Sequence, residues 1–255
     1  MVTYELNNRV AYITLNRPEK RNALNPEMVT LLNENLDKAA LDNECKVVVL
    51  QSMGDAFCAG ADLAFLQQLQ QNSYDENLAD SEHLMRMFKR IYQHPKMIIA
   101  KIQGHALAGG CGLATVCDYS IAVPEAKFGY TEVKIGFIPA IVKVFLIRKI
   151  GEGKAREILL TGQVFDALRA LNLGLINEVV SADELDDRIQ EFVEQICLQT
   201  SSQSIALTKE MIDEVQNKTL DEALNYAATM NAKARATVDC KKGIQSFLNK
   251  APLSW

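Results

Sequence analysis

The sequence predicts an α/β fold, because strand and helix patterns alternate up to about Ala182 and only helical patterns follow. Some strand patterns are continuous β-branched runs, as in a sheet that is covered on both faces. No repeat of fixed period, low-complexity tract or Pro/Gly linker divides the chain. We therefore expect one main core followed by a helical region.

The strand patterns of the first part are of two kinds. The first two, 2–6 and 10–15, flank Asn7-Asn8, residues that tolerate the positive φ of a tight turn, and they predict a β-hairpin. The next two, 47–50 and 97–102, are apolar, and the first is a continuous β-branched run. Both are expected inside the sheet.

Helix patterns lie between these strands. Asn25 followed by Pro26 supplies an N-cap and a first helical residue, and apolar side chains continue at helical spacing to about Leu41. The polar stretch 67–80 has little periodicity and no strand character, so we expect a mobile connection there, followed by a helix from about Ser81.

The last third predicts helices alone. Ser181 with Glu184, and Thr219 with Glu222, fit the capping box, in which two side chains satisfy free backbone amides at a helix start. Apolar residues at helical spacing follow the first of these signals, and a further helix is expected before the second.

The composition argues against two classes of partner, nucleic acids and membranes. A net charge of −5 argues against nucleic acid as a partner, since such binders concentrate Lys and Arg on one face. No apolar run approaches membrane-spanning length, and no basic segment followed by an apolar one opens the chain. We therefore expect no nucleic acid, no membrane and a cytoplasmic location.

The cysteines and histidines lack the spacing of metal sites. Six cysteines are scattered without a CxxC pair, and three histidines lack close helical spacing. Buried reduced thiols and no metal are predicted. Cys58 and Cys111 are expected as small packing residues, the alternative for Cys111 being a thiol whose pKa a helix start lowers.

Two segments rich in small residues, 55–63 and 104–114, each follow a predicted buried strand and open an apparent helix, and Asp62 can cap the helix that follows the first segment. A helix N-terminus carries unpaired N–H groups and a partial positive charge, so it can stabilise an oxyanion. For either segment taken alone, a tight strand-to-helix junction is the favoured interpretation. Two of them converging would form an oxyanion hole.

A third segment, 126–140, places Glu132 among apolar neighbours. A carboxyl in such surroundings has a raised pKa and can exchange protons near neutral pH. A salt-bridged structural glutamate is the alternative for this residue taken alone.

These three segments, with 16–24 upstream, closely resemble the crotonase (enoyl-CoA hydratase/isomerase) family in order, spacing and residues, over nearly the whole chain. The resemblance implies an α/β, crotonase-like spiral of ββα units, here residues 1–185, with a C-terminal helical region for trimerisation, residues 186–255. It also implies an acyl-CoA thioester as substrate, no separate cofactor because coenzyme A is part of the substrate, and a homotrimer or a dimer of trimers.

The resemblance implies roles for individual residues. The amides of Ala61 and Gly109 would form the oxyanion hole around the thioester oxygen, and Glu132 would transfer protons. Phe247 and Lys250 would reach coenzyme A from a neighbouring subunit, although a core contact and a solvated charge are alternatives for these two. The other residues implied to bind coenzyme A are Arg21, Ala23, Ala59, Asp62 and Leu63.

The sequence departs from the family's best-known hydratases at Gly112, where those enzymes carry a second glutamate. Two acids suit hydration, whereas a single acid suits a proton shuttle between carbons. The chain nevertheless resembles a branch that reads like methylglutaconyl-CoA hydratase through 136–142. We therefore expect a hydratase of leucine degradation that uses one glutamate.

Three alternatives remain open from the sequence. A Δ3,Δ2-enoyl-CoA isomerase would be served equally well by a single glutamate. Decarboxylation of a malonyl-type or glutaconyl-type thioester needs the oxyanion hole but no base, and is expected less than isomerisation. A catalytically silent scaffold that binds coenzyme A would show no effect of Glu132→Gln on any reaction.

Overall fold

The computed structural model describes residues 1–255, whose strands form two sheets. The larger sheet has the strand order β1-β2-β3-β5-β7-β10 and the smaller one β4-β6-β8-β9. The strands are β1 (Val2–Asn7), β2 (Val10–Leu15), β3 (Val47–Ser52), β4 (Ala56–Cys58), β5 (Met97–Ile102), β6 (His105–Leu107), β7 (Tyr119–Ala122), β8 (Lys127–Gly129), β9 (Phe165–Asp166) and β10 (Glu178–Val179).

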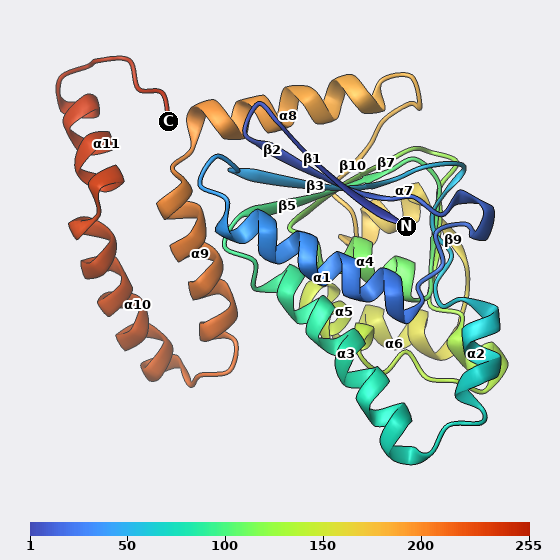
Figure 1. Ribbon diagram of the computed structural model, residues 1–255. Coiled ribbons are helices and arrows are strands. Elements are labelled where there is room, and N and C mark those ends of the chain that lie inside the picture. Colours follow the sequence, from blue (N-terminus) through green and yellow to red (C-terminus); the bar gives the residue numbers. More distant parts are fainter.

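Consecutive strands divide between the two sheets. In each of the pairs β3/β4, β5/β6 and β7/β8, the first strand joins the larger sheet and the second joins the smaller one. Neighbouring strands from successive pairs are parallel in both sheets, and helices connect one pair to the next (Figure 1). The repeating unit is therefore ββα, wound as a spiral.

Helices cover both faces of the larger sheet, with α8 on one side and α1 and α4 on the other (Figure 1). Two short 3-10 turns, η1 (Pro18–Lys20) and η2 (Glu132–Ile135), complete the elements. The helices are α1 (Pro26–Leu41), α2 (Leu63–Leu69), α3 (Tyr74–Tyr92), α4 (Gly109–Val116), α5 (Val142–Ile150), α6 (Glu152–Thr161), α7 (Ala167–Leu173), α8 (Leu185–Gln199), α9 (Ser202–Val215), α10 (Leu220–Ala236) and α11 (Val238–Leu248). None of them is both long and apolar enough to cross a lipid bilayer.

The core lies between the sheets and the helices that cover them. Residues 47–50 of β3 are buried, as expected of a strand covered on both faces. Helix α8 buries Leu185, Ile189 and Val193 against the larger sheet. Because full burial of one such side chain contributes about 1.5–3 kcal/mol, these contacts hold α8 firmly to the core.

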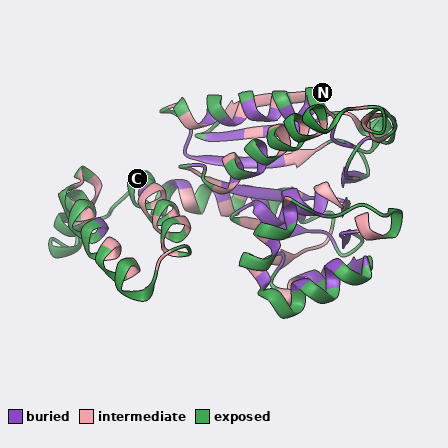
Figure 2. Ribbon diagram, turned by 90° about the horizontal axis from the view of Figure 1, so that it is seen from below, coloured by how far each residue is buried: buried purple, intermediate pink, exposed green.

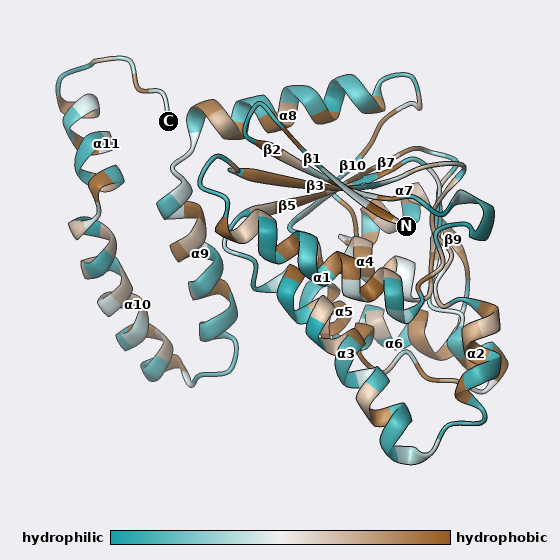
Figure 3. Cartoon of the chain, in the orientation of Figure 1, coloured by the Kyte–Doolittle hydropathy of each residue, from teal (hydrophilic) through white to brown (hydrophobic).

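The last three helices, α9 to α11, form an arm that projects from the core (Figure 1). Most of the arm is exposed or half-buried, in contrast to the buried sheets (Figure 2), and Met230 is the one buried residue of its helices. Hydrophobic residues nevertheless run along it (Figure 3). The large apolar residues that it exposes are Ile212, Leu220, Leu224, Val238, Ile244, Phe247 and Leu248.

The predicted hairpin, the first helix and the two buried strands are confirmed, but three local expectations were wrong. The positive φ values of the hairpin turn fall on Asn8 and Arg9, one residue later than expected. Helix α3 begins at Tyr74 because Ser73 and Glu76 form a capping box that overrides the weak periodicity of the polar stretch. No mobile connection fills 67–80, since α2 extends to Leu69.

The two C-terminal capping signals had different outcomes. Thr219 and Glu222 form the predicted capping box at the start of α10. Ser181 donates a hydrogen bond to the Glu184 carboxylate, but α8 starts only after Glu184, which is its N-cap residue. The Ser181 signal therefore stabilises the turn before the helix.

Candidate active site

Three strands of the smaller sheet end at one edge. Strands β4, β6 and β8 are parallel neighbours, and Ala61, Gly109 and Glu132 follow their carboxyl ends within three residues. Ligands of parallel sheets bind outside the carboxyl ends of the strands. The fold thus brings Ala61, Gly109 and Glu132, which the sequence predicts as site residues, to the same edge of the sheet.

The segments that carry the two amides are in contact. Gly60 has φ +96°, and a Cβ atom on it would lie 2.9 Å from Ala108 Cβ and 3.6 Å from the Gly109 amide nitrogen. A side chain at Gly60 would therefore be strained and crowded. Glycine at this position lets the loop after β4 approach the start of α4.

Neither of the two amides donates to a backbone carbonyl. Beside Ala61, the Gly60 carbonyl accepts from the Leu24 amide at 2.7 Å and the Asp62 amide donates to the Leu24 carbonyl at 2.8 Å, whereas the Ala61 amide donates to no backbone carbonyl. Gly109 is the first residue of α4, where an amide has no intrahelical acceptor. This arrangement can stabilise negative charge on a bound oxygen atom.

The residue before Gly109 stores backbone strain. Ala108 has φ 48° and ψ −121°, a conformation that a residue with a Cβ atom rarely adopts. Its amide donates to the Gly129 carbonyl at 2.7 Å, which fixes the loop to β8. Such strain, of order 1–3 kcal/mol, persists where the surroundings determine the backbone, and it concentrates at functional sites.

Glu132 is the first residue of η2 and is half-buried. Its Oε2 atom is buried and has no hydrogen-bond partner. Burial raises the pKa of this carboxyl above its ordinary value. The expected raised pKa is found, and no ion pair of the salt-bridged alternative is present.

The position of the absent second acid is closed. A Cβ atom on Gly112 would lie 2.3 Å from Val142 Cγ1 and 3.1 Å from Phe88 Cε1. Helix α5 therefore packs against α4 where a second glutamate would need room. Apolar side chains occupy the surroundings of Gly112.

Most residues implied to bind coenzyme A lie together. The Ala59 amide donates to the Arg21 carbonyl at 3.0 Å, and a parallel bridge pairs Leu24 with Ala61, so the segment 21–24 runs beside 59–62. Ala23 is buried, whereas the Leu63 side chain is exposed (78%). The structure thus brings Arg21, Ala23, Ala59, Asp62 and Leu63 to one place.

Asp62 already has intramolecular partners. Its carboxylate accepts from the Arg17 guanidinium at 2.6 Å and from the Ala64 and Phe65 amides at 2.8 and 3.4 Å, which makes it the N-cap of α2 as expected. Burial alone would raise the pKa of Asp62, but these hydrogen bonds lower it below its ordinary value. Arg17 lies in the segment 16–24, which contributes to the family resemblance, but the sequence alone does not predict its pairing with Asp62.

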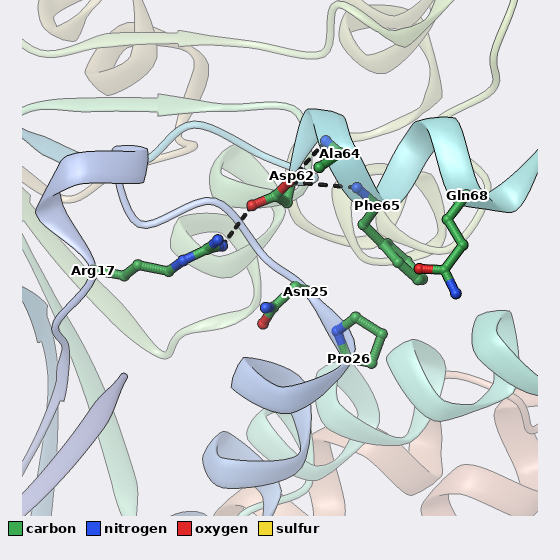
Figure 4. Close-up of a pocket in the computed structure, with 7 residues that line it drawn as sticks. All are labelled: Arg17, Asn25, Pro26, Asp62, Ala64, Phe65 and Gln68. Atoms are coloured by element: carbon green, nitrogen blue, oxygen red, sulfur yellow. Dashed lines mark hydrogen bonds and ion pairs between the residues drawn. The ribbon is translucent and has the colours of Figure 1, made fainter.

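A pocket of about 310 Å³ lies beside this ion pair (Figure 4). The Arg17–Asp62 pair forms part of its wall, and the start of α1 and helix α2 supply the rest. The pocket adjoins the residues implied to bind coenzyme A but contains none of Ala61, Gly109 and Glu132. Its lining residues are Arg17, Asn25, Pro26, Asp62, Ala64, Phe65 and Gln68.

Phe247 and Lys250 lie apart from these residues, on α11 and directly after it (Figure 1). Phe247 is 84% exposed, so it makes no core contact within the chain. Their implied role in a neighbouring subunit stays a prediction.

The cysteines are free thiols, and all except the half-buried Cys240 are buried. Burial raises the pKa of both Cys58 and Cys111 to about 12. The packing role is therefore the correct one for Cys111, and the helix start does not activate it. No group of three His, Cys, Asp or Glu side chains has a geometry that could hold a metal ion.

Known proteins resemble the chain over almost its full length. The family model for enoyl-CoA hydratase/isomerase matches residues 5–255. A Thermus thermophilus protein with an enoyl-CoA hydratase name is 42% identical over 243 residues, 95% of this chain and 96% of the other. The (E)-benzylidenesuccinyl-CoA hydratase of Thauera aromatica is 34% identical over 251 residues, 96% of this chain and 95% of the other. The crystal structure of an enoyl-CoA hydratase from Shewanella pealeana is 30% identical, with a TM-score of 0.94 and coverage of 100% of this chain and 95% of the other.

Two amides without a backbone acceptor and one half-buried carboxyl lie at the same edge of the smaller sheet, and the relatives identify the family of enzymes to which this chain belongs. The chain belongs to the enoyl-CoA hydratase/isomerase family and is an enzyme of that family. The α/β fold of spiral ββα units with C-terminal helices is confirmed. An acyl-CoA thioester as substrate is consistent with this family.

Proposed function

We propose that this enzyme adds water across the double bond of an α,β-unsaturated acyl-CoA, with Glu132 as its single acid–base group. The observation that carries the proposal is the buried Oε2 atom of Glu132, which has no partner in the protein. A buried carboxyl oxygen that lacks a hydrogen bond is costly, and a bound water or substrate would satisfy it.

One carboxyl suffices for the reaction if it acts twice. Glu132 takes a proton from water while the water oxygen bonds to the β-carbon, and the electron pair of the double bond moves onto the thioester oxygen. The amides of Ala61 and Gly109 hold that oxygen as an enolate. Glu132 then returns the proton to the α-carbon, which regenerates the carboxylate.

The substrate that we propose first is 3-methylglutaconyl-CoA, a branched thioester with a second carboxyl group. The resemblance through 136–142 supports this choice. The Thauera relative supports it further, because its name specifies a succinyl thioester, which also carries a second carboxyl. The proposal places the enzyme in leucine degradation.

A second candidate function is Δ3,Δ2-enoyl-CoA isomerisation. It is favoured by the contact between Gly112 and Val142, which leaves no room for an acid that would hold water. In that reaction Glu132 takes a proton from one carbon of the substrate and returns it to another. No water is consumed.

We also propose that the arm assembles copies of this chain into a trimer or a dimer of trimers. Its apolar side chains are exposed in the single chain, and exposed apolar surface of this extent marks an interaction site. In the assembly, Phe247 and Lys250 would reach the coenzyme A of a neighbouring subunit. Lys250 would meet a phosphate group.

The test uses three thioesters in H₂¹⁸O: 3-methylglutaconyl-CoA, crotonyl-CoA and a 3-enoyl-CoA. Product mass and label position are followed for the wild type and for Glu132→Gln. Label at the β-carbon that disappears in the variant is the expected result. A shifted double bond without label would assign isomerase, and binding without turnover of any thioester would assign a scaffold.

A further inference from the structure

The Glu132 carboxyl is positioned only through its own backbone. No hydrogen bond or ion pair from another side chain reaches it, and its Oε2 atom has no partner at all. Proton transfer nevertheless needs the carboxyl at a fixed distance from the oxyanion amides. The position of the carboxyl therefore depends on the contacts that fix the backbone of this segment.

From Thr131 onward, the backbone around Glu132 is bonded only locally. The Thr131 carbonyl accepts from the Lys134 amide at 3.0 Å and the Glu132 carbonyl accepts from the Phe137 amide at 3.0 Å, both within η2 and its end. Tyr130 makes no backbone hydrogen bond. Its hydroxyl, however, lies 2.7 Å from Thr115 Oγ1 on α4, and both side chains are buried.

The direction of this hydrogen bond follows from the proton count. Thr115 donates its one hydroxyl proton to the Cys111 carbonyl at 2.9 Å, so Tyr130 must be the donor to Thr115. Lys149 fixes the same turn of α4, because its Nζ atom donates to the carbonyls of Thr115 and Cys117 at 2.9 and 3.1 Å. The acceptor for Tyr130 is thus itself held in place.

We propose that Tyr130 is a positioning residue for the acid–base group, holding Glu132 in register with the oxyanion amide of Gly109. Both ends of the connection lie on α4, since Gly109 begins this helix and Thr115 lies in its last turn. The hydroxyl of Tyr130 therefore connects the helix that binds the enolate to the segment that moves its proton. This inference rests on the proposed function.

Loss of the hydroxyl should change the chemical step more than binding. A displacement of about 1 Å at a reacting group can cost about 10²-fold in rate. We expect Tyr130→Phe to lower kcat by about 10- to 100-fold and to leave KM nearly unchanged. A freer carboxyl is also better hydrated, which lowers its pKa and moves the acidic limb of the pH–rate profile to lower pH.

The pH–rate profile reports on Glu132 because the titratable groups next to it do not change charge in the pH range of the measurement. The groups beside it are the Tyr130 hydroxyl and the Cys111 thiol, and burial raises the pKa of both, that of Cys111 to about 12. Neither group changes charge near neutral pH.

The experiment compares Tyr130→Phe, Thr115→Val and the double variant with Tyr119→Phe. Tyr119 is the matched control, because its hydroxyl also donates a hydrogen bond, to Glu178 at 2.7 Å, but away from Glu132. If the bond positions Glu132, the two single variants and the double variant lose similar activity and share the shifted acidic limb. Tyr119→Phe should keep the wild-type limb.

A second readout separates failure of this inference from failure of the proposed function. Infrared difference spectra of the carboxyl band, assigned with Glu132→Gln, follow the protonation of Glu132 without any substrate. An active wild type whose Tyr130→Phe variant keeps its kcat and its infrared titration would overturn the positioning role. An inactive wild type would remove the proposed function, and the infrared titration alone would then decide the role of Tyr130.

Discussion

The Oε2 atom of Glu132 is buried and has no hydrogen-bond partner, and the charge of this carboxyl is therefore costly in the folded protein. The same property suits a group that must take and return a proton near neutral pH. Ala108 and Glu132 lie on adjacent loops, so two energetically unfavourable features meet at this site. Their proximity is typical of functional sites, where strain and perturbed pKa values concentrate.

At the residue scale, the stability of Glu132→Gln should depend on pH differently from that of the wild type. The folded pKa of Glu132 lies above the unfolded one, so the folded state binds this proton more tightly. Wild-type stability should therefore fall, relative to the variant, as pH rises from the unfolded pKa through the folded one. Urea unfolding midpoints from acidic to neutral pH measure this, and a difference independent of pH would contradict the raised pKa.

At the element scale, the contact between α4 and α5 controls what can stand at Gly112. Gly112→Ala would place a Cβ atom against Val142, and overpacking of this kind costs about 1–3 kcal/mol. Val142→Ala in the same chain should recover part of that loss, so the two changes are expected to be non-additive. Chemical denaturation of both single variants and the double variant tests this. Strictly additive losses would mean that α5 moves away freely.

The elements with strong local signals could be predicted from the sequence. Asn25-Pro26 predicted the start of α1, and Asp62 predicted the cap of α2, because each signal acts within a few residues. The start of α3 at Tyr74 was missed, although Ser73 and Glu76 carry the same kind of signal as Thr219 and Glu222. The Ser73 signal lies in a polar stretch whose weak periodicity by itself predicts no helix.

Contacts between distant segments could not be predicted in the same way. The pairings of Tyr130 with Thr115, of Arg17 with Asp62 and of Gly112 with Val142 join residues that only the tertiary fold brings together. No periodicity or composition encodes such pairs. The spiral of ββα units was implied only by the family resemblance, and the division of consecutive strands between two sheets was not predicted, because each strand pattern alone fits a single sheet equally well.

At the scale of the whole molecule, the arm should determine the state of assembly. We expect the full chain to sediment as a trimer or hexamer, and Phe247→Asp to weaken that assembly by placing a charge on an apolar contact. Gln245→Asp is the matched control, since it adds the same charge at another exposed position of α11. Analytical ultracentrifugation measures both variants. A monomeric full chain would contradict the proposed role of the arm.

Because the chain alternates between two sheets, the order of synthesis determines when each strand can pair with its neighbours. The buried strand β3 pairs with β2, which precedes it, and with β5, which is made only after α3. A nascent chain that ends at α3 thus exposes the edge of an apolar strand, the kind of edge that pairs with other chains and promotes aggregation. The amides of Ala61 and Gly109 come together only once α4 has formed, and Glu132 is synthesised later still. A nascent chain that lacks β5 is therefore both incomplete at the site and prone to aggregate. Once β5 has been synthesised, it pairs with β3 and covers this edge.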